Sequence, residues 1–126
     1  MAEKKKKEPE FYLGHIIQAA DDIAEYIGGC DKKSFFDDKK THDATIRQLM
    51  IIGEATKNLP QTFRRKYPEI PWKKIAGTRD RLVHEYFGVD MGLAWIMAKN
   101  DVPNLKEKIA LIMRSDYDVR QKKLLK

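Results

Sequence analysis

The sequence contains a single cysteine, Cys30, and lacks the features of several common protein classes. One cysteine cannot form a disulfide within the chain, so a small disulfide-stabilised domain is excluded. No apolar run approaches the roughly 18 residues that a membrane-spanning helix requires. The lysines near the N-terminus are not followed by the apolar segment of a signal peptide. We therefore expect a cytoplasmic protein that makes no contact with a membrane.

Motifs that mark several enzyme classes are also missing. The sequence has no glycine-rich phosphate loop, no cysteine and histidine spacing typical of a metal site, and no serine in a nucleophile elbow. We expect neither a bound metal ion nor a cofactor.

The net charge of +6 is concentrated at the two ends of the 126-residue chain. Residues 1–8 carry +2 and residues 114–126 carry +3, which leaves +1 for the segment between them. We expect basic tails at residues 1–9 and 116–126, with one helical domain at residues 10–115. That domain contains one basic cluster, which is consistent with a nucleic-acid partner. Its members are Arg64, Arg65, Lys66, Lys73, Lys74, Arg79 and Arg81.

Apolar residues recur at helical spacing over residues 13–27, with polar residues on the opposite side. The pair Gly28–Gly29 is expected to end this first helix. A second helix is expected from residue 38 or 41 to residue 59, after a connection that carries Phe35 and Phe36.

Gly53 lies inside the second helix, where glycine costs about 1 kcal/mol relative to alanine, so we expect a close helix–helix approach there. Prolines restrict residues 60–78 to short helical pieces. Further helices are expected over residues 79–87, 91–99 and 101–113, with Asp90 as the N-cap of the second of these. No stretch alternates with the period of a strand. The sequence therefore predicts an all-α fold, an antiparallel bundle of four or five helices.

The segment Arg79–Phe87 combines an arginine, a histidine and a tyrosine: Arg79, His84 and Tyr86. RNA cleavage by attack of the 2′-hydroxyl on the adjacent phosphorus requires only proton transfer and charge stabilisation. Histidine titrates near neutrality and can move that proton. Arginine stays charged and its planar fork matches the phosphorane oxygens. A surface lattice of ion pairs is the alternative interpretation.

Other reactive or aromatic side chains have simpler interpretations. Cys30 has no evident activating partner, and His15 and His42 are expected at the surface. Trp72 and Trp95 are expected to fill the core.

A helical wheel places Arg79 and His84 roughly 140° apart, so one straight helix would not bring them together. Either Arg79 precedes the regular part of the helix, or a second copy of the motif completes the site across a two-fold interface. The second possibility predicts a homodimer.

At these residues the sequence resembles the HEPN superfamily of helical ribonucleases, whose signature is Arg, four to six residues, His, any residue, Tyr. Within it, the chain resembles the HepT-like toxins of HepT/MntA toxin–antitoxin pairs over residues 11–113. The likeness is carried by Asp43-Ala44, Ile51-Ile52-Gly53-Glu54-Ala55, Tyr67-Pro68-Glu69-Ile70-Pro71-Trp72, Arg81-Leu82-Val83-His84 and Tyr86-Phe87-Gly88-Val89-Asp90. Asp80 stands where the family often has Asn.

The resemblance implies a dimerising helical bundle in which both motifs line a cleft at the interface. It also implies a nucleotidyltransferase antitoxin that uses ATP to attach AMP to Tyr86. We interpret the chain as a metal-independent endoribonuclease toxin with His84 as general acid and base, Arg79 as transition-state stabiliser and Asp80 as an orienting group. Candidate RNA contacts are Arg81, Lys73, Lys74, Arg64 and Arg65.

Two other functions are compatible with the same residues. In the first, the chain is a non-catalytic helical subunit that binds nucleotide and positions a nucleotidyltransferase. In the second, it is a purely structural helical dimer.

Overall fold

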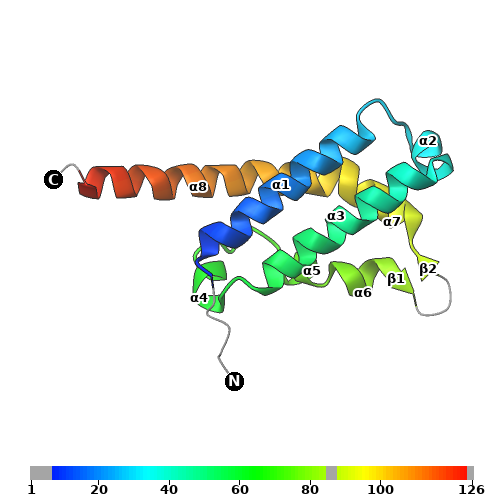
Figure 1. Cartoon of the computed structure of the whole chain (residues 1–126). Helices are drawn as coiled ribbons and strands as arrows, with labels where there is room; N and C mark the ends of the chain where they lie inside the picture. The colour runs from blue at the N-terminus through cyan, green and yellow to red at the C-terminus, as the bar shows by residue number, and fades with distance from the viewer. Residues whose placement is uncertain (1–6, 85–87, 125–126) are drawn as a thin grey trace, which may run out of the picture.

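The computed structural model describes residues 7–84 and 88–124, and side chains only as far as residue 115. Its main body is formed by three long helices, α1 (Pro9–Ile27), α3 (Lys39–Lys57) and α8 (Val102–Leu124). Helices α1 and α3 run antiparallel side by side, and α1 also packs against α8 (Figure 1). This confirms the predicted all-α class.

Helix α1 supplies the centre of the core. Leu13, Ile16 and Ile23 on its inner face are fully buried. The helix ends at Ile27, and Gly29 adopts a φ of +82°, a left-handed conformation that glycine reaches without steric cost. The predicted end of the first helix is confirmed.

A short helix, α2 (Lys32–Asp37), lies where the sequence predicted only a connection. Asp31 and Ser34 form a reciprocal capping box at its start, with Ser34 N–H donating to Asp31 Oδ1 at 2.8 Å and Asp31 N–H donating to Ser34 Oγ at 3.0 Å. Phe35 is fully buried. The capping box and the buried Phe35 stabilise this helix. It is too short to show a periodic apolar pattern in the sequence.

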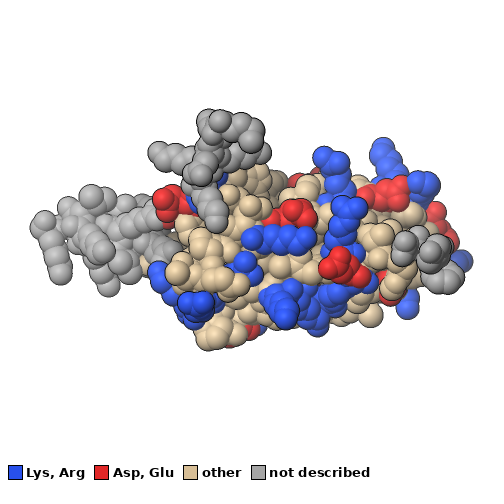
Figure 2. Space-filling model, turned by 90° about the horizontal axis from the view of Figure 1, so that it is seen from below, with Lys and Arg blue, Asp and Glu red and all other residues tan. Residues whose placement is uncertain are grey.

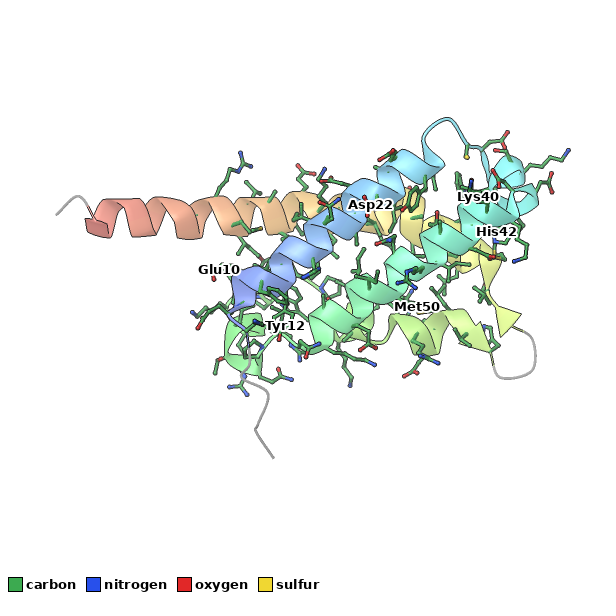
Figure 3. All side chains as sticks on the ribbon, viewed as in Figure 1. Glu10, Tyr12, Asp22, Lys40, His42 and Met50 are labelled. Carbon is green, nitrogen blue, oxygen red and sulfur yellow. The ribbon has the colours of Figure 1, made fainter. Side chains whose placement is uncertain are left out.

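Helix α3 begins after Asp38, whose carboxylate accepts hydrogen bonds from the Thr41 hydroxyl at 2.8 Å and the Thr41 backbone N–H at 3.2 Å. These bonds hold the pKa of the Asp38 carboxyl below its usual value. His42 lies near the start of the helix (Figure 3). It was expected at the surface, but only 17% of its side chain is exposed. Its Nδ1 lies 3.1 Å from Asp43 Oδ1 without the alignment of a hydrogen bond. Its ring is covered by Phe35 from α2, an element that the sequence did not predict.

At Gly53, α3 lies very close to the segment that leads into the candidate site. A Cβ atom at this position would lie 3.1 Å from Thr78 Cβ and 3.2 Å from the Ile75 carbonyl oxygen. Both distances are tighter than ordinary van der Waals contact. The predicted close approach at Gly53 is confirmed.

Three short helices follow, α4 (Gln61–Arg64), α5 (Trp72–Ala76) and α6 (Thr78–Leu82). The predicted role of Trp72 as a core residue is confirmed, because only 6% of it is exposed. Its indole N–H donates to the carbonyl oxygens of Arg64 at 3.1 Å and Tyr67 at 3.0 Å. This tryptophan therefore ties α5 to α4 and to the turn that follows it.

The predicted helix over residues 79–87 is wrong beyond Leu82, since the chain turns there into a short antiparallel hairpin of β1 (Val83–His84) and β2 (Gly88–Val89). The Leu82 carbonyl accepts a hydrogen bond from the Asp90 backbone N–H at 2.7 Å, so it is not available to a continuing helix. Gly88 adopts a φ of +75°. A two-residue strand is too short to show alternation, which is why the sequence predicted no strand.

Helix α7 (Met91–Ile96) continues through a π-helical turn, η1 (Met97–Asp101), directly into α8. The sequence predicted a break near Asp101, but the chain stays helical. Pro103 lacks an N–H and would crowd the carbonyl four residues earlier in a regular helix. The wider π turn just before it accommodates this proline.

Trp95 of α7 is partly buried and its ring lies 5.1 Å from that of Phe35. His15 is exposed on α1, as expected. Among the residues that the structure describes, no helix combines the length and apolar character needed to cross a membrane.

Candidate functional site

Helix α6 presents Arg79 and Asp80 to solvent. Thr78 and Leu82 are buried on its inner face, and the Thr78 hydroxyl donates to the Ile75 carbonyl oxygen at 2.6 Å. Arg79 and Asp80 are both exposed, and Arg81 is partly buried on another side of the helix. The two buried residues therefore anchor a very short helix with its arginines on separate faces.

His84 lies on β1, two residues beyond the end of α6, with about half of its side chain exposed. Its Nε2 is 3.9 Å from Oδ2 of Asp90. The other oxygen of Asp90, Oδ1, accepts a hydrogen bond at 3.0 Å from the backbone N–H of Leu93 and so caps α7. One carboxylate thus fixes the start of a helix and faces the imidazole.

Asp90 was predicted from the sequence only as a helix cap, and that prediction is confirmed. Its second role was missed because the contact with His84 depends on the hairpin, which no sequence pattern indicated. Asp80 was predicted to orient His84. Within the described residues no hydrogen bond or ion pair joins these two side chains, and the role of Asp80 stays a prediction.

Tyr86 lies outside the residues that the structure describes. Its place in the cleft that the resemblance implies therefore stays a prediction. The wheel argument that set Arg79 and His84 roughly 140° apart no longer applies, because the two residues belong to different elements, α6 and β1.

The residues predicted to contact RNA differ in how far their side chains are exposed and available for hydrogen bonds. Figure 2 views the side on which α4, α5 and α6 lie in Figure 1, and Lys and Arg side chains are spread along that face. Lys73, Lys74 and Arg65 are exposed. Arg64 donates through Nε to the Leu59 carbonyl oxygen at 2.9 Å, so part of its hydrogen-bonding capacity serves the fold.

This arrangement has the components of acid–base chemistry on an anionic polymer. A half-exposed imidazole faced by a carboxylate can exchange protons with a bound group. An exposed guanidinium on the preceding helix can neutralise charge on a phosphate.

Comparison with known proteins agrees with this chemistry. Residues 16–112 match the family model described as ribonuclease HepT-like. Among curated relatives, a probable ribonuclease HepT of Thermococcus cleftensis is 47% identical over 82% of this chain and 94% of its own length. A putative RNase of Caldanaerobacter subterraneus is 41% identical over 87% of this chain and 98% of its own length.

A third relative has a longer chain. It is named gamma-glutamylcyclotransferase and putative RNase, from Methanocaldococcus jannaschii, and is 49% identical over 86% of this chain but only 49% of its own length. This chain therefore spans about half of that relative. No solved structure is significantly similar to this chain.

Proposed function

Because this chain belongs to the HepT-like ribonuclease family, we propose that it cuts RNA internally, without a metal ion, through Arg79 and His84. One observation carries the proposal: the imidazole of His84 is accessible, is faced by Asp90, and follows directly on the short helix that exposes Arg79.

In the proposed reaction the ribose 2′-oxygen forms a bond to the adjacent phosphorus as its proton passes to His84. The bond from phosphorus to the 5′-oxygen breaks, and that oxygen receives a proton from the His84 imidazolium. The products are a 2′,3′-cyclic phosphate and a 5′-hydroxyl. Arg79 would donate to the phosphorane oxygens, where negative charge increases.

Asp90 would hold the imidazole in position through its Oδ2 atom and stabilise the imidazolium. Asp80, exposed next to Arg79, remains our proposed second orienting group.

The test is cleavage of a purified RNA by the purified chain in excess EDTA, followed by analysis of the new ends. We expect cleavage to persist, with cyclic phosphate at the 3′ ends and hydroxyl at the 5′ ends. DNA of the same sequence should remain intact because it lacks the 2′-hydroxyl. RNA that stays whole would instead favour a non-catalytic subunit of a nucleotidyltransferase.

We further propose that the chain is the toxin of a toxin–antitoxin pair and acts as a homodimer. Next to His84, Val83 is 39% exposed, and Ile96 of the following helix α7 is 48% exposed. The proposed dimer interface would include these two side chains. The proposed antitoxin is an ATP-using nucleotidyltransferase that modifies Tyr86.

The modification predicts a specific change at Tyr86. Its phenolic oxygen would attack the α-phosphorus of ATP, which forms a phosphodiester with AMP and releases pyrophosphate. The added anion could pair with Arg79 and occupy the path of the RNA, so cleavage should stop. Mass spectrometry after incubation with the cognate nucleotidyltransferase and ATP should find AMP on Tyr86.

Two variants control this experiment. Tyr86→Phe should resist modification, and Tyr12→Phe on the remote helix α1 should be modified and silenced like the unchanged protein. AMP found only on another residue, or modified protein that still cuts RNA, would contradict the proposed regulation.

A further inference from the structure

A pocket of about 210 Å³ lies beside α6, and the proposed function does not yet account for it. It lies between α3, α5, α6, η1 and α8, and it is separate from the contact between His84 and Asp90. Its floor consists of buried apolar side chains, among them Leu49, Ile52 and Leu105.

The rim of this pocket is positively charged. Lys74, Arg81 and Lys108 line it, against one carboxylate, Asp101. Among the residues that the structure describes, none of these three cations takes part in a side-chain hydrogen bond or an ion pair. Three unpaired cations around one acid favour an anionic ligand.

The floor and the rim together indicate a ligand with an apolar part and a charged part. A nucleotide has both, because its base offers an apolar face and its phosphate offers charge. Asn104 on the rim carries an amide that can both donate to and accept from the edge of a base. Pockets that enclose a whole drug-sized ligand begin at about 300 Å³, so this one suits a single unit of a longer chain.

Helix α6 connects the pocket to the candidate catalytic site. Thr78 and Arg81 line the pocket, while Arg79 lies between them in sequence and is exposed. A strand whose phosphate meets Arg79 would have to cross this five-residue helix to reach the pocket rim.

We propose that this pocket binds one nucleotide of the RNA substrate next to the cleaved bond, with its base on the apolar floor and its phosphate on Lys74, Arg81 and Lys108. This inference rests on the proposed ribonuclease function. It assigns distinct roles to the basic residues, since Lys74 and Arg81 line the pocket whereas Lys73, the neighbour of Lys74, does not.

The test measures binding of a fluorescent single-stranded RNA with 2′-O-methyl groups, which cannot undergo 2′-hydroxyl attack. By fluorescence anisotropy, Lys74→Gln, Arg81→Gln and Lys108→Gln should each weaken binding about three- to tenfold. Combined in one protein, the three substitutions should reduce the salt dependence of log K by about 0.7, the loss of one phosphate contact with a single strand. Lys73→Gln, which removes the same charge from the same helix outside the pocket, should have a clearly smaller effect.

A second variant separates insertion of the base from attraction by charge. Asn104→Trp would fill the pocket from its rim without changing the charge, and it should weaken binding about tenfold with the salt dependence preserved. An RNA with abasic sugars should bind weakly to the unchanged protein and show little sensitivity to this variant. Circular dichroism should show that all variants are folded.

Several results would overturn the assignment. If Lys73→Gln and Lys74→Gln have equal effects, the RNA is held by diffuse electrostatic attraction and not by the pocket. If free AMP or ATP binds through Arg81 and RNA does not compete with it, the pocket is a mononucleotide site. A monomer produced by Asn104→Trp from a dimeric protein would mean that a second copy of the chain covers the pocket. Cleavage of ordinary RNA, measured in parallel, separates the two proposals. If all pocket variants bind and cleave RNA normally, only the pocket assignment is wrong. If the unchanged protein neither binds nor cleaves RNA, the proposed ribonuclease function is wrong.

Discussion

Replacing His84 or Arg79 with alanine is expected to reduce RNA cleavage by at least about 100-fold while the fold remains intact. A positioned general acid or base contributes roughly 10²–10⁴-fold, and a donor to the developing anion roughly 10²–10³-fold. Both side chains are exposed, so their removal should leave the core unchanged. The measurement is the initial cleavage rate, with thermal unfolding followed for each variant.

Matched variants make this result specific. His15→Ala removes another exposed histidine, on α1, and should retain full cleavage. Arg79→Lys keeps the charge but loses the planar fork, so its rate should lie between those of the unchanged protein and Arg79→Ala. Full activity in both alanine variants, or unfolding of either, would remove these residues from the proposed site.

The same variants test whether two chains form one site. If the homodimer combines Arg79 of one chain with His84 of the other, mixing the two inactive variants should restore part of the activity, because some mixed dimers then contain one intact site. No recovery after subunit exchange would mean that each chain carries its own complete site.

Gly53→Val is expected to destabilise the protein by about 1–3 kcal/mol, which lowers Tm by roughly 10 °C. The new Cβ would meet Thr78 Cβ at 3.1 Å and the Ile75 carbonyl oxygen at 3.2 Å, and the two γ-methyl groups would add further overlap. The strain can be relieved by displacing α6, which carries Arg79. Cleavage should therefore fall by more than the unfolded fraction explains.

Gly14→Val supplies the control, because Gly14 also lies inside a long helix but a Cβ added there would meet no atom within 4 Å outside its own helix and chain neighbours. Valine has a slightly better helix propensity than glycine, so this variant should be neutral or stabilised by roughly a few tenths of a kcal/mol. If both substitutions have the same effect, the close approach at Gly53 does not hold α6 in place.

The long helices and their ends could be predicted from the sequence because their causes are local. The apolar period of residues 13–27 and the glycine pair after it determine α1, and the carboxylate of Asp90 begins α7 as a cap. The constraint at Gly53 was also predictable, since an interior glycine in a helix implies something close by. Asp31 and Ser34 were a local signal for α2 that the prediction did not use.

The candidate site was found through its residue types, but its geometry was predicted wrongly. Nothing local to Val83 and His84 shows that the helix must end at Leu82, because that end depends on the Asp90 N–H eight residues later. The same long-range bond brings Asp90 to His84. His42 is covered in a comparable way by Phe35 from another helix.

The sequence by itself determined the helical class, the family and the residues that we propose as the catalytic site, because each depends on side-chain type and short-range spacing. Only the tertiary structure decided which carboxylate faces His84, which of the basic residues surround a pocket, and where the motif changes from helix to strand. The pocket depends on how α3, α5, α6, η1 and α8 pack together, and the other two features depend on the hydrogen bond between the Asp90 N–H and the Leu82 carbonyl. Hydrogen bonds and pocket walls between separate elements depend on how those elements pack together. The spacing of residues along a single helix does not predict this packing.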